Sequence, residues 1–163
     1  MLRSPPKFKQ ALETLAHHEV AFVVVGGVAA VLAGAPISTF DLDVVHARDP
    51  ANVDRLLDAL TELDARYRDP GGRIRRPTAD ALAGPGHHLL MTTCGPVDVL
   101  GRIGAGQDHS DLVPDSVALQ VGDCIVRVLG LPALIRTKAE AGRDKDRAVL
   151  AILRHTLEQA QKG

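Results

Sequence analysis

Residues 22–45 read FVVVGGVAAVLAGAPISTFDLDVV and carry two strand signals on either side of a helix signal. The apolar, β-branched run FVVV stops at Gly26 and Gly27, which is typical of a buried strand ending in a tight turn. The backbone at such a turn can approach a ligand closely. Residues 28–33 are good helix formers, and the helix should end before Pro36. We therefore expect a strand, a short helix and a second strand in immediate succession.

The second strand signal, residues 40–45, contains two carboxylates. A period of two places Asp41 and Asp43 on one face of the strand and apolar side chains on the other. Like charges at neighbouring positions repel, so the pair costs stability unless a cation lies between them. Hard oxygen ligands with no Cys or His in the cluster favour magnesium or manganese over zinc. A solvated edge strand is the alternative that this motif leaves open.

Length and composition indicate the class of protein. A chain of 163 residues with 45% hydrophobic residues suits a single domain, residues 1–163. No apolar segment reaches the roughly 18 residues of a membrane helix, so we expect no membrane partner. Cys94 and Cys124 form no spaced pair, which fits a reducing cytoplasm. Nineteen Lys and Arg against 20 Asp and Glu exclude a global basic field for nucleic acid.

The first helix signal has Ser4 as N-cap and Pro5 at the first helical position. It ends at His17 and His18, which we assign no role because adjacent side chains on a helix point apart. After the short helix of residues 28–33, another helix should open at Asp49.

Residues 66–86 lose periodicity and gain Pro, Gly and Arg, including Arg66, Arg68, Arg73, Arg75 and Arg76. This composition predicts a mobile loop. The loop could meet phosphates or an acidic partner, or its charges could only keep it soluble.

Two hairpins are expected after this loop, one over residues 87–100 and one over residues 117–128. The first hairpin places Asp98 inside an apolar strand. A carboxylate there is expensive to bury unless it is paired or bound to a metal. Asp98 is therefore a third candidate metal ligand.

The C-terminal part of the chain is helical and has two charged residues on its apolar faces. Lys138 shares a face with Leu134 and Ile135, and Asp146 lies three residues before Val149 on the apolar side of the last helix. A structural ion pair between the two helices and a role in a functional site are both open.

Taken in order, these motifs resemble the nucleotidyltransferase superfamily with a DNA polymerase β-like catalytic core. The pattern is a strand that ends at Gly26 and Gly27, a thirteen-residue spacer, Asp41 and Asp43, and then Asp98 in a later strand. The C-terminal segments 134–138 and 142–146 look similar to those of minimal bacterial members of antitoxin and abortive-infection type.

The resemblance implies an α+β fold, with a mixed β-sheet flanked by helices and a C-terminal helical segment. The catalytic core would cover about residues 1–128 and the C-terminal helices about residues 129–163. It also implies magnesium-dependent transfer of a nucleoside monophosphate from a nucleoside triphosphate (NTP) to a hydroxyl on a protein or an RNA. The setting would be a toxin–antitoxin or phage-defence system.

Roles for the candidate residues follow from the same resemblance. Asp41 and Asp43 would hold two magnesium ions, one of them shared with Asp98 to activate the acceptor hydroxyl. The backbone at Gly26 and Gly27 would meet the phosphates at a helix N-terminus.

Lys138 would contact the triphosphate, and Asp146 would belong to the same nucleotide site. Two other classes of function stay open. One is an antitoxin-like module that acts by contact with a partner protein, and the other is a metal-stabilised structural domain without transfer activity.

Overall fold

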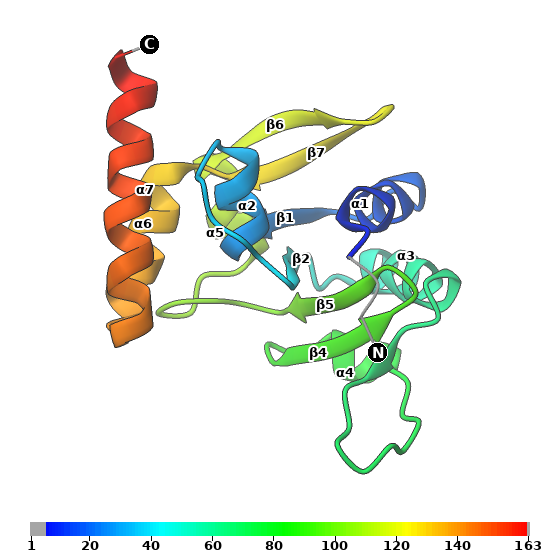
Figure 1. Cartoon of the computed structure of the whole chain (residues 1–163). Helices are drawn as coiled ribbons and strands as arrows, with labels where there is room; N and C mark the ends of the chain where they lie inside the picture. The colour runs from blue at the N-terminus through cyan, green and yellow to red at the C-terminus, as the bar shows by residue number, and fades with distance from the viewer. Residues whose placement is uncertain (1–5, 163) are drawn as a thin grey trace.

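The computed structural model describes residues 6–162, apart from the side chain of Lys145, and is built around one seven-stranded sheet (Figure 1). The strands lie in the order β3-β4-β5-β2-β1-β7-β6. β1 runs parallel to β7 and β2 parallel to β5, whereas the other neighbouring pairs are antiparallel. The predicted mixed sheet is therefore confirmed. The strand bounds are β1 Phe22–Val25, β2 Leu42–His46, β3 Arg66–Tyr67, β4 His87–Thr92, β5 Gly95–Leu100, β6 Ser116–Val121 and β7 Cys124–Leu129.

Helices flank this sheet, and two of them form the C-terminal segment. α1 contacts β6, β7 and α3, whereas α2 contacts β1, β2, β7 and α6. α6 packs against α7, and Figure 1 shows this pair at one end of the molecule with α1 and α3 at the other. The arrangement predicted for the α+β fold is confirmed. The helix bounds are α1 Phe8–His17, α2 Gly26–Leu32, α3 Pro50–Glu62, α4 Ala79–Leu82, α5 His109–Leu112, the 3₁₀ turn η1 Val113–Asp115, α6 Leu131–Ala141 and α7 Asp144–Lys162.

The two faces of the sheet differ in how well they are covered. On β4, His88 and Leu90 are buried, whereas Leu89 between them is 47% exposed. The strand register places Leu89 opposite Asp98, and Asp98 opposite Asp43. Because paired residues point to the same face, the two carboxylates lie on the more open face.

The acidic strand is shorter than predicted. β2 begins at Leu42, so Asp41 lies just before the strand and not within it. The cause is the turn at Gly26, where a φ of +66° ends β1. Val25 and Asp43 are therefore the last residues that pair between β1 and β2. Helix α2 correspondingly starts at Gly26, two residues before the predicted helix.

The prediction of a loop over the whole of residues 66–86 was wrong at both ends. β3 extends the edge of the sheet by pairing with Leu90 and Met91 of β4, and α4 begins after Thr78. The Thr78 hydroxyl accepts a hydrogen bond from the Ala81 amide at 3.3 Å, which caps that helix. The residues between β3 and α4 do form a loop.

The other predicted elements are largely confirmed. The Asp49 side chain caps α3, and the two hairpins appear as β4–β5 and β6–β7. Gly142 closes α6 in the left-handed conformation that glycine favours. The predicted N-cap Ser4 and Pro5 lie outside the described residues, and α1 begins at Phe8. The single domain and its division near residue 128 stay predictions. Within residues 6–162, no helix combines the length and apolar character needed to cross a membrane.

Candidate active site

The centre of the candidate site is a pair of carboxylates on adjacent parallel strands. Asp43 of β2 and Asp98 of β5 are register partners, so their side chains stand next to each other on the same face. Burial and the neighbouring Asp98 raise the pKa of Asp43 to about 7, and Asp41 adds to this effect. Burial also raises the pKa of Asp98. The two side chains are therefore placed to share one proton when no cation is bound.

One oxygen of this pair lacks a hydrogen-bond partner. Asp43 Oδ1 is buried, and nothing in the described chain donates a hydrogen bond to it. An unpaired buried carboxylate oxygen is costly, and a divalent cation is the ligand that best offsets that cost. The residues present therefore fit a magnesium-class ion held by Asp43 and Asp98, with Asp41 nearby as a candidate third oxygen ligand.

Arg68 is the cation that the structure places among these carboxylates. Its Nη2 donates a hydrogen bond to Asp98 Oδ1 at 2.5 Å, and its Nη1 lies 3.6 Å from Asp41 Oδ1. This guanidinium counteracts the rise in the pKa of Asp98. The oxygens of the three carboxylates do not all lie within 4.8 Å of one another in the described chain, so Asp41 must move closer to share a metal with the pair.

Arg68 is the functional candidate that the sequence did not single out from its neighbours. It follows β3, and its amide donates to the Leu89 carbonyl at 3.1 Å, which extends the pairing with β4. A strand of two residues has no periodicity to detect. Only the pairing of β3 with β4 directs this arginine, among the five of the segment, to the carboxylates.

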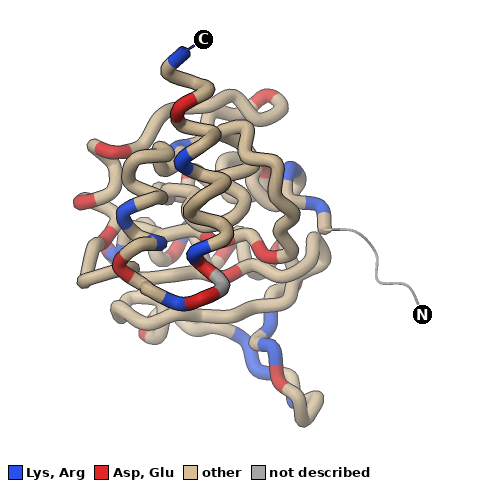
Figure 2. Tube along the Cα trace, turned by 60° about the vertical axis from the view of Figure 1, so that its left-hand side comes forward, with Lys and Arg blue, Asp and Glu red and all other residues tan. Residues whose placement is uncertain are grey.

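An open cleft lies beside Arg68. It has a volume of about 520 Å³, and its lining includes Arg66, Arg68, Arg73 and the apolar side chains of Ile74 and Met91. Figure 2 shows Lys and Arg gathered along the projecting loop at the bottom of the view. Asp69 also lines the cleft and pairs with Arg73 at 2.8 Å, so Arg66 and Arg68 supply the remaining positive charge of the cleft, and Arg68 bonds to the acidic pair.

Gly26 and Gly27 each allow a close approach, but to side chains of this chain. A Cβ at Gly26 would overlap the Asp43 carboxylate. A Cβ at Gly27 would come within 2.5 Å of Thr39 Oγ1, and the Thr39 hydroxyl donates to the Asp41 carbonyl at 3.3 Å. Gly26 thus lets the Asp43 carboxylate, and Gly27 the Thr39 side chain, lie against the start of α2.

The structure contains the ion pair that was one interpretation of Lys138 and Asp146. Lys138 Nζ lies 3.3 Å from Asp146 Oδ1, and Arg143 Nε donates to Asp146 Oδ2 at 2.8 Å. Asp146 is 2% exposed, and both oxygens of its carboxylate are bonded to Lys138 or Arg143. The charge of Lys138 also acts to lower the pKa of Asp43, against the larger effects that raise it.

Comparison with solved structures identifies the architecture that carries this site. The lincosamide antibiotic adenylyltransferase LnuA, in its lincomycin-bound form, aligns over 93% of this chain and 98% of its own, with a TM-score of 0.60 and 11% identity. The chain has the nucleotidyltransferase fold.

Two further structures of the same class align with the chain. The resistance factor ANT(2'')-Ia matches with a TM-score of 0.58 and 10% identity, over 92% of this chain and 84% of its own. A candidate nucleotidyltransferase from Thermotoga maritima, TM1012, matches with a TM-score of 0.56 and 18% identity, over 93% of this chain and 91% of its own. No known family profile matches the sequence, and no curated protein matches it.

Proposed function

We propose that the protein is a metal-dependent nucleotidyltransferase that moves a nucleoside monophosphate from an NTP to a hydroxyl group and releases pyrophosphate. The observation that carries the proposal is the Asp43–Asp98 register pair with its unpartnered Oδ1, next to Asp41. The nucleotidyltransferase fold supports the same assignment.

In this proposal, the carboxylates bind the magnesium ion, and one of them accepts the proton of the acceptor hydroxyl. Magnesium, when bound by Asp41, Asp43 and Asp98, supplies charge neutralisation at the phosphates and lowers the pKa of the acceptor hydroxyl. Asp98 takes the hydroxyl proton. The hydroxyl oxygen then bonds to the α-phosphorus, and the bond from the α-phosphorus to the oxygen that bridges to the β-phosphate breaks, so that pyrophosphate leaves with those electrons.

The cations of the chain bind and orient the nucleotide. Lys138 lies close enough to act on the charge of Asp43 and can reach the phosphates while it stays near Asp146. Gly26 and Gly27 leave backbone amides without side chains at the start of α2. Arg68 must leave Asp41 and Asp98 when a metal binds, and it then becomes free to contact a phosphate or the acceptor.

The acceptor in this proposal is a hydroxyl on a protein or an RNA, within a toxin–antitoxin or phage-defence system in the cytoplasm. LnuA is named for its lincosamide substrate, and a small antibiotic is therefore the other acceptor class to test. The arginine-lined cleft favours an acceptor that carries negative charge, since positive side chains attract anions and repel cationic drugs.

The test is to incubate the purified protein with each labelled NTP and magnesium or manganese, together with separate protein, RNA and antibiotic pools. Label in the protein or RNA pool, lost in Asp98→Asn, supports the proposal. Label only in the antibiotic pool overturns the acceptor class. No label in any pool, together with a stable complex with one partner protein, favours the contact-only antitoxin-like module.

A further inference from the structure

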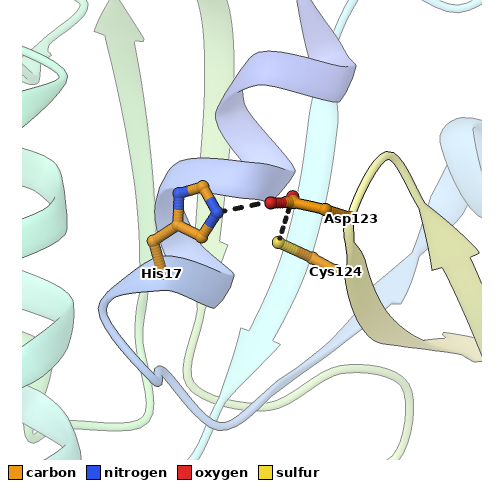
Figure 3. Close-up of side chains that lie close together, drawn as sticks. All are labelled: His17, Asp123 and Cys124. Atoms are coloured by element: carbon orange, nitrogen blue, oxygen red, sulfur yellow. Dashed lines mark hydrogen bonds and ion pairs between the residues drawn. The ribbon is translucent and has the colours of Figure 1, made fainter.

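A second group of metal-ligating side chains lies at the far edge of the sheet from β3, β4 and β5. His17 at the end of α1 meets Asp123 and Cys124 at the turn between β6 and β7 (Figure 3). We call these three residues the hairpin-turn cluster. Their nitrogen, oxygen and sulfur atoms all lie within 4.8 Å of one another.

The spacing of the cluster fits one tetrahedral ion. His17 Nε2 lies 3.5 Å from Asp123 Oδ1, and Cys124 Sγ lies 3.2 Å from the same oxygen. Zinc bonds of about 2.0–2.3 Å in a tetrahedron put neighbouring ligand atoms roughly 3.3–3.8 Å apart. Two of the three separations are therefore close to the required value before any metal is added. A small rotation of the exposed His17 side chain can adjust the third.

The chemistry of this cluster differs from that of the catalytic carboxylates. Imidazole and thiolate ligands with one carboxylate select zinc-class ions, whereas three carboxylates select magnesium or manganese. The two sites would therefore take different ions from the same solution.

A fourth ligand is close to the cluster. Glu13 lies one helical turn before His17 on the same face of α1. A Cβ at Gly122 would come within 2.7 Å of Glu13 Oε2, so this carboxylate already reaches the hairpin turn. The hydrogen bond that the Cys124 thiol donates to Asp123 raises the pKa of that thiol, and burial and the negative charges of Asp123 and Glu13 add to the rise. A bound cation offsets that charge and displaces the thiol proton to solvent.

We propose that His17, Asp123 and Cys124 bind one zinc-class divalent cation, with Glu13 or a water molecule as the fourth ligand. The ion ties the end of α1 to the β6–β7 turn. It thereby fixes the helix across β6 and β7, which α1 contacts in the fold.

Cobalt is the probe for this site, because a cobalt–thiolate bond absorbs light and a cobalt–carboxylate site gives no such band. The metal-free protein is titrated with Co²⁺ in the Asp98→Asn background, which weakens the catalytic carboxylates as a competing site. We expect a thiolate-to-cobalt band that saturates at one equivalent and disappears on addition of zinc. Cys124→Ser should abolish the band, and His17→Gln should weaken cobalt binding at least tenfold.

Matched controls come from residues of the same types in this chain. Cys94→Ser removes the other cysteine, which is buried, and His18→Gln removes the histidine next to His17. Both should leave the band and the affinity unchanged. Circular dichroism of each metal-free variant tests that it is folded.

Three results overturn the proposal. These are no thiolate band at one equivalent, a band that persists in folded Cys124→Ser, and a band that is lost in Cys94→Ser but kept in Cys124→Ser. As a second measurement, zinc should raise the melting temperature of the wild-type protein but not of Cys124→Ser. An equal rise in both contradicts the site. None of these readings depends on transferase activity, so failure here leaves the proposed function untouched.

Discussion

Asp43 and Asp146 are both poorly accessible carboxylates, but they differ in their hydrogen-bond partners and in the direction of their pKa shifts. Asp146 accepts hydrogen bonds from Arg143 and Lys138, and these partners hold its pKa below the usual value. Asp43 keeps one buried oxygen without a partner, and its pKa is raised to about 7. The comparison teaches that a buried acid whose oxygens are hydrogen-bonded is costly to remove from its partners, whereas a buried carboxylate oxygen left without a partner is available to a ligand.

Replacement of Asp43, the acid with an unpartnered oxygen, should have the largest effect, and the effect should be on nucleotide transfer. Asp43→Asn should lower nucleotide transfer about 1,000-fold or more, because the ion that it helps to hold supplies several kcal/mol of charge stabilisation. It should also lose magnesium-dependent nucleotide binding. Asp98→Asn should transfer equally poorly but still bind nucleotide, which calorimetric titration can measure.

The matched control for this pair is Asp58→Asn, which changes an exposed carboxylate on α3. Transfer by Asp58→Asn should equal that of the wild-type protein. Transfer by Asp98→Asn at the wild-type rate would remove Asp98 from the site.

The raised pKa of Asp43 should appear as a pH dependence of stability in the metal-free protein. The folded state keeps a proton on Asp43 up to about pH 7, whereas the unfolded chain releases it near the usual aspartate pKa of 3.8. The stabilisation is therefore fully present below about pH 4 and is lost as the pH rises to and beyond 7. The loss should be on the order of a few kcal/mol at most.

The comparison of Asp43→Asn with the wild-type protein isolates this effect. Buried His46 and His88 have lowered pKa values and change stability in the opposite sense near neutral pH, but they are common to both proteins. In urea unfolding with a chelator, the stability difference should move in favour of Asp43→Asn from pH 5 to pH 8. A constant difference would mean that Asp43 is ionised throughout.

Removal of the paired acid should act on stability. Asp146→Asn should cost about 1–3 kcal/mol of unfolding free energy, less than the 3–5 typical of a fully buried pair because Arg143 is 56% exposed. Lys138→Ala should lower stability less, and it should also weaken nucleotide binding if Lys138 contacts the phosphates as proposed. A Lys138→Ala variant with normal nucleotide affinity and a large stability loss would make this lysine purely structural.

Replacement of Arg68 should give the smallest effect, and it should strengthen magnesium binding. Arg68→Gln removes the guanidinium that competes for Asp41 and Asp98, so magnesium affinity of the nucleotide-free protein should rise about tenfold, or roughly 1.4 kcal/mol. Calorimetry with magnesium alone measures this. Arg75→Gln is the control, because Arg75 lies over the Tyr67 ring and away from the carboxylates. Weaker magnesium binding in Arg68→Gln would show that this arginine supports the metal site.

The strand positions of Asp43 and Asp98 could be predicted from the sequence because their signals are local: a period of two in residues 40–45 and an apolar strand around Asp98. The parallel pairing of β2 with β5, which makes the two carboxylates register partners, was not predicted. The ion pair of Lys138 with Asp146 was visible from helical spacing as one of two interpretations.

The other contacts could not be predicted because they depend on how distant segments dock. Arg68 reaches Asp98 only because β3 adds to the edge of β4. His17 reaches Cys124 only because α1 packs on the hairpin, more than a hundred positions further along the chain. The clash that a side chain at Gly27 would meet with Thr39 also depends on the fold of the intervening loop. No local pattern carries this information.

The parallel pairing of β1 with β7 has a consequence for synthesis of the chain. Val23 and Val24 find their partners at Arg127 and Val128, so a ribosome must make more than three quarters of the protein before the central strand can complete its hydrogen bonds. Until then one edge of β1, four apolar residues long, stays open to pairing with any other strand. A nascent chain that stalls before residue 124 should therefore need chaperone protection, and this long delay in sheet closure should make folding slow.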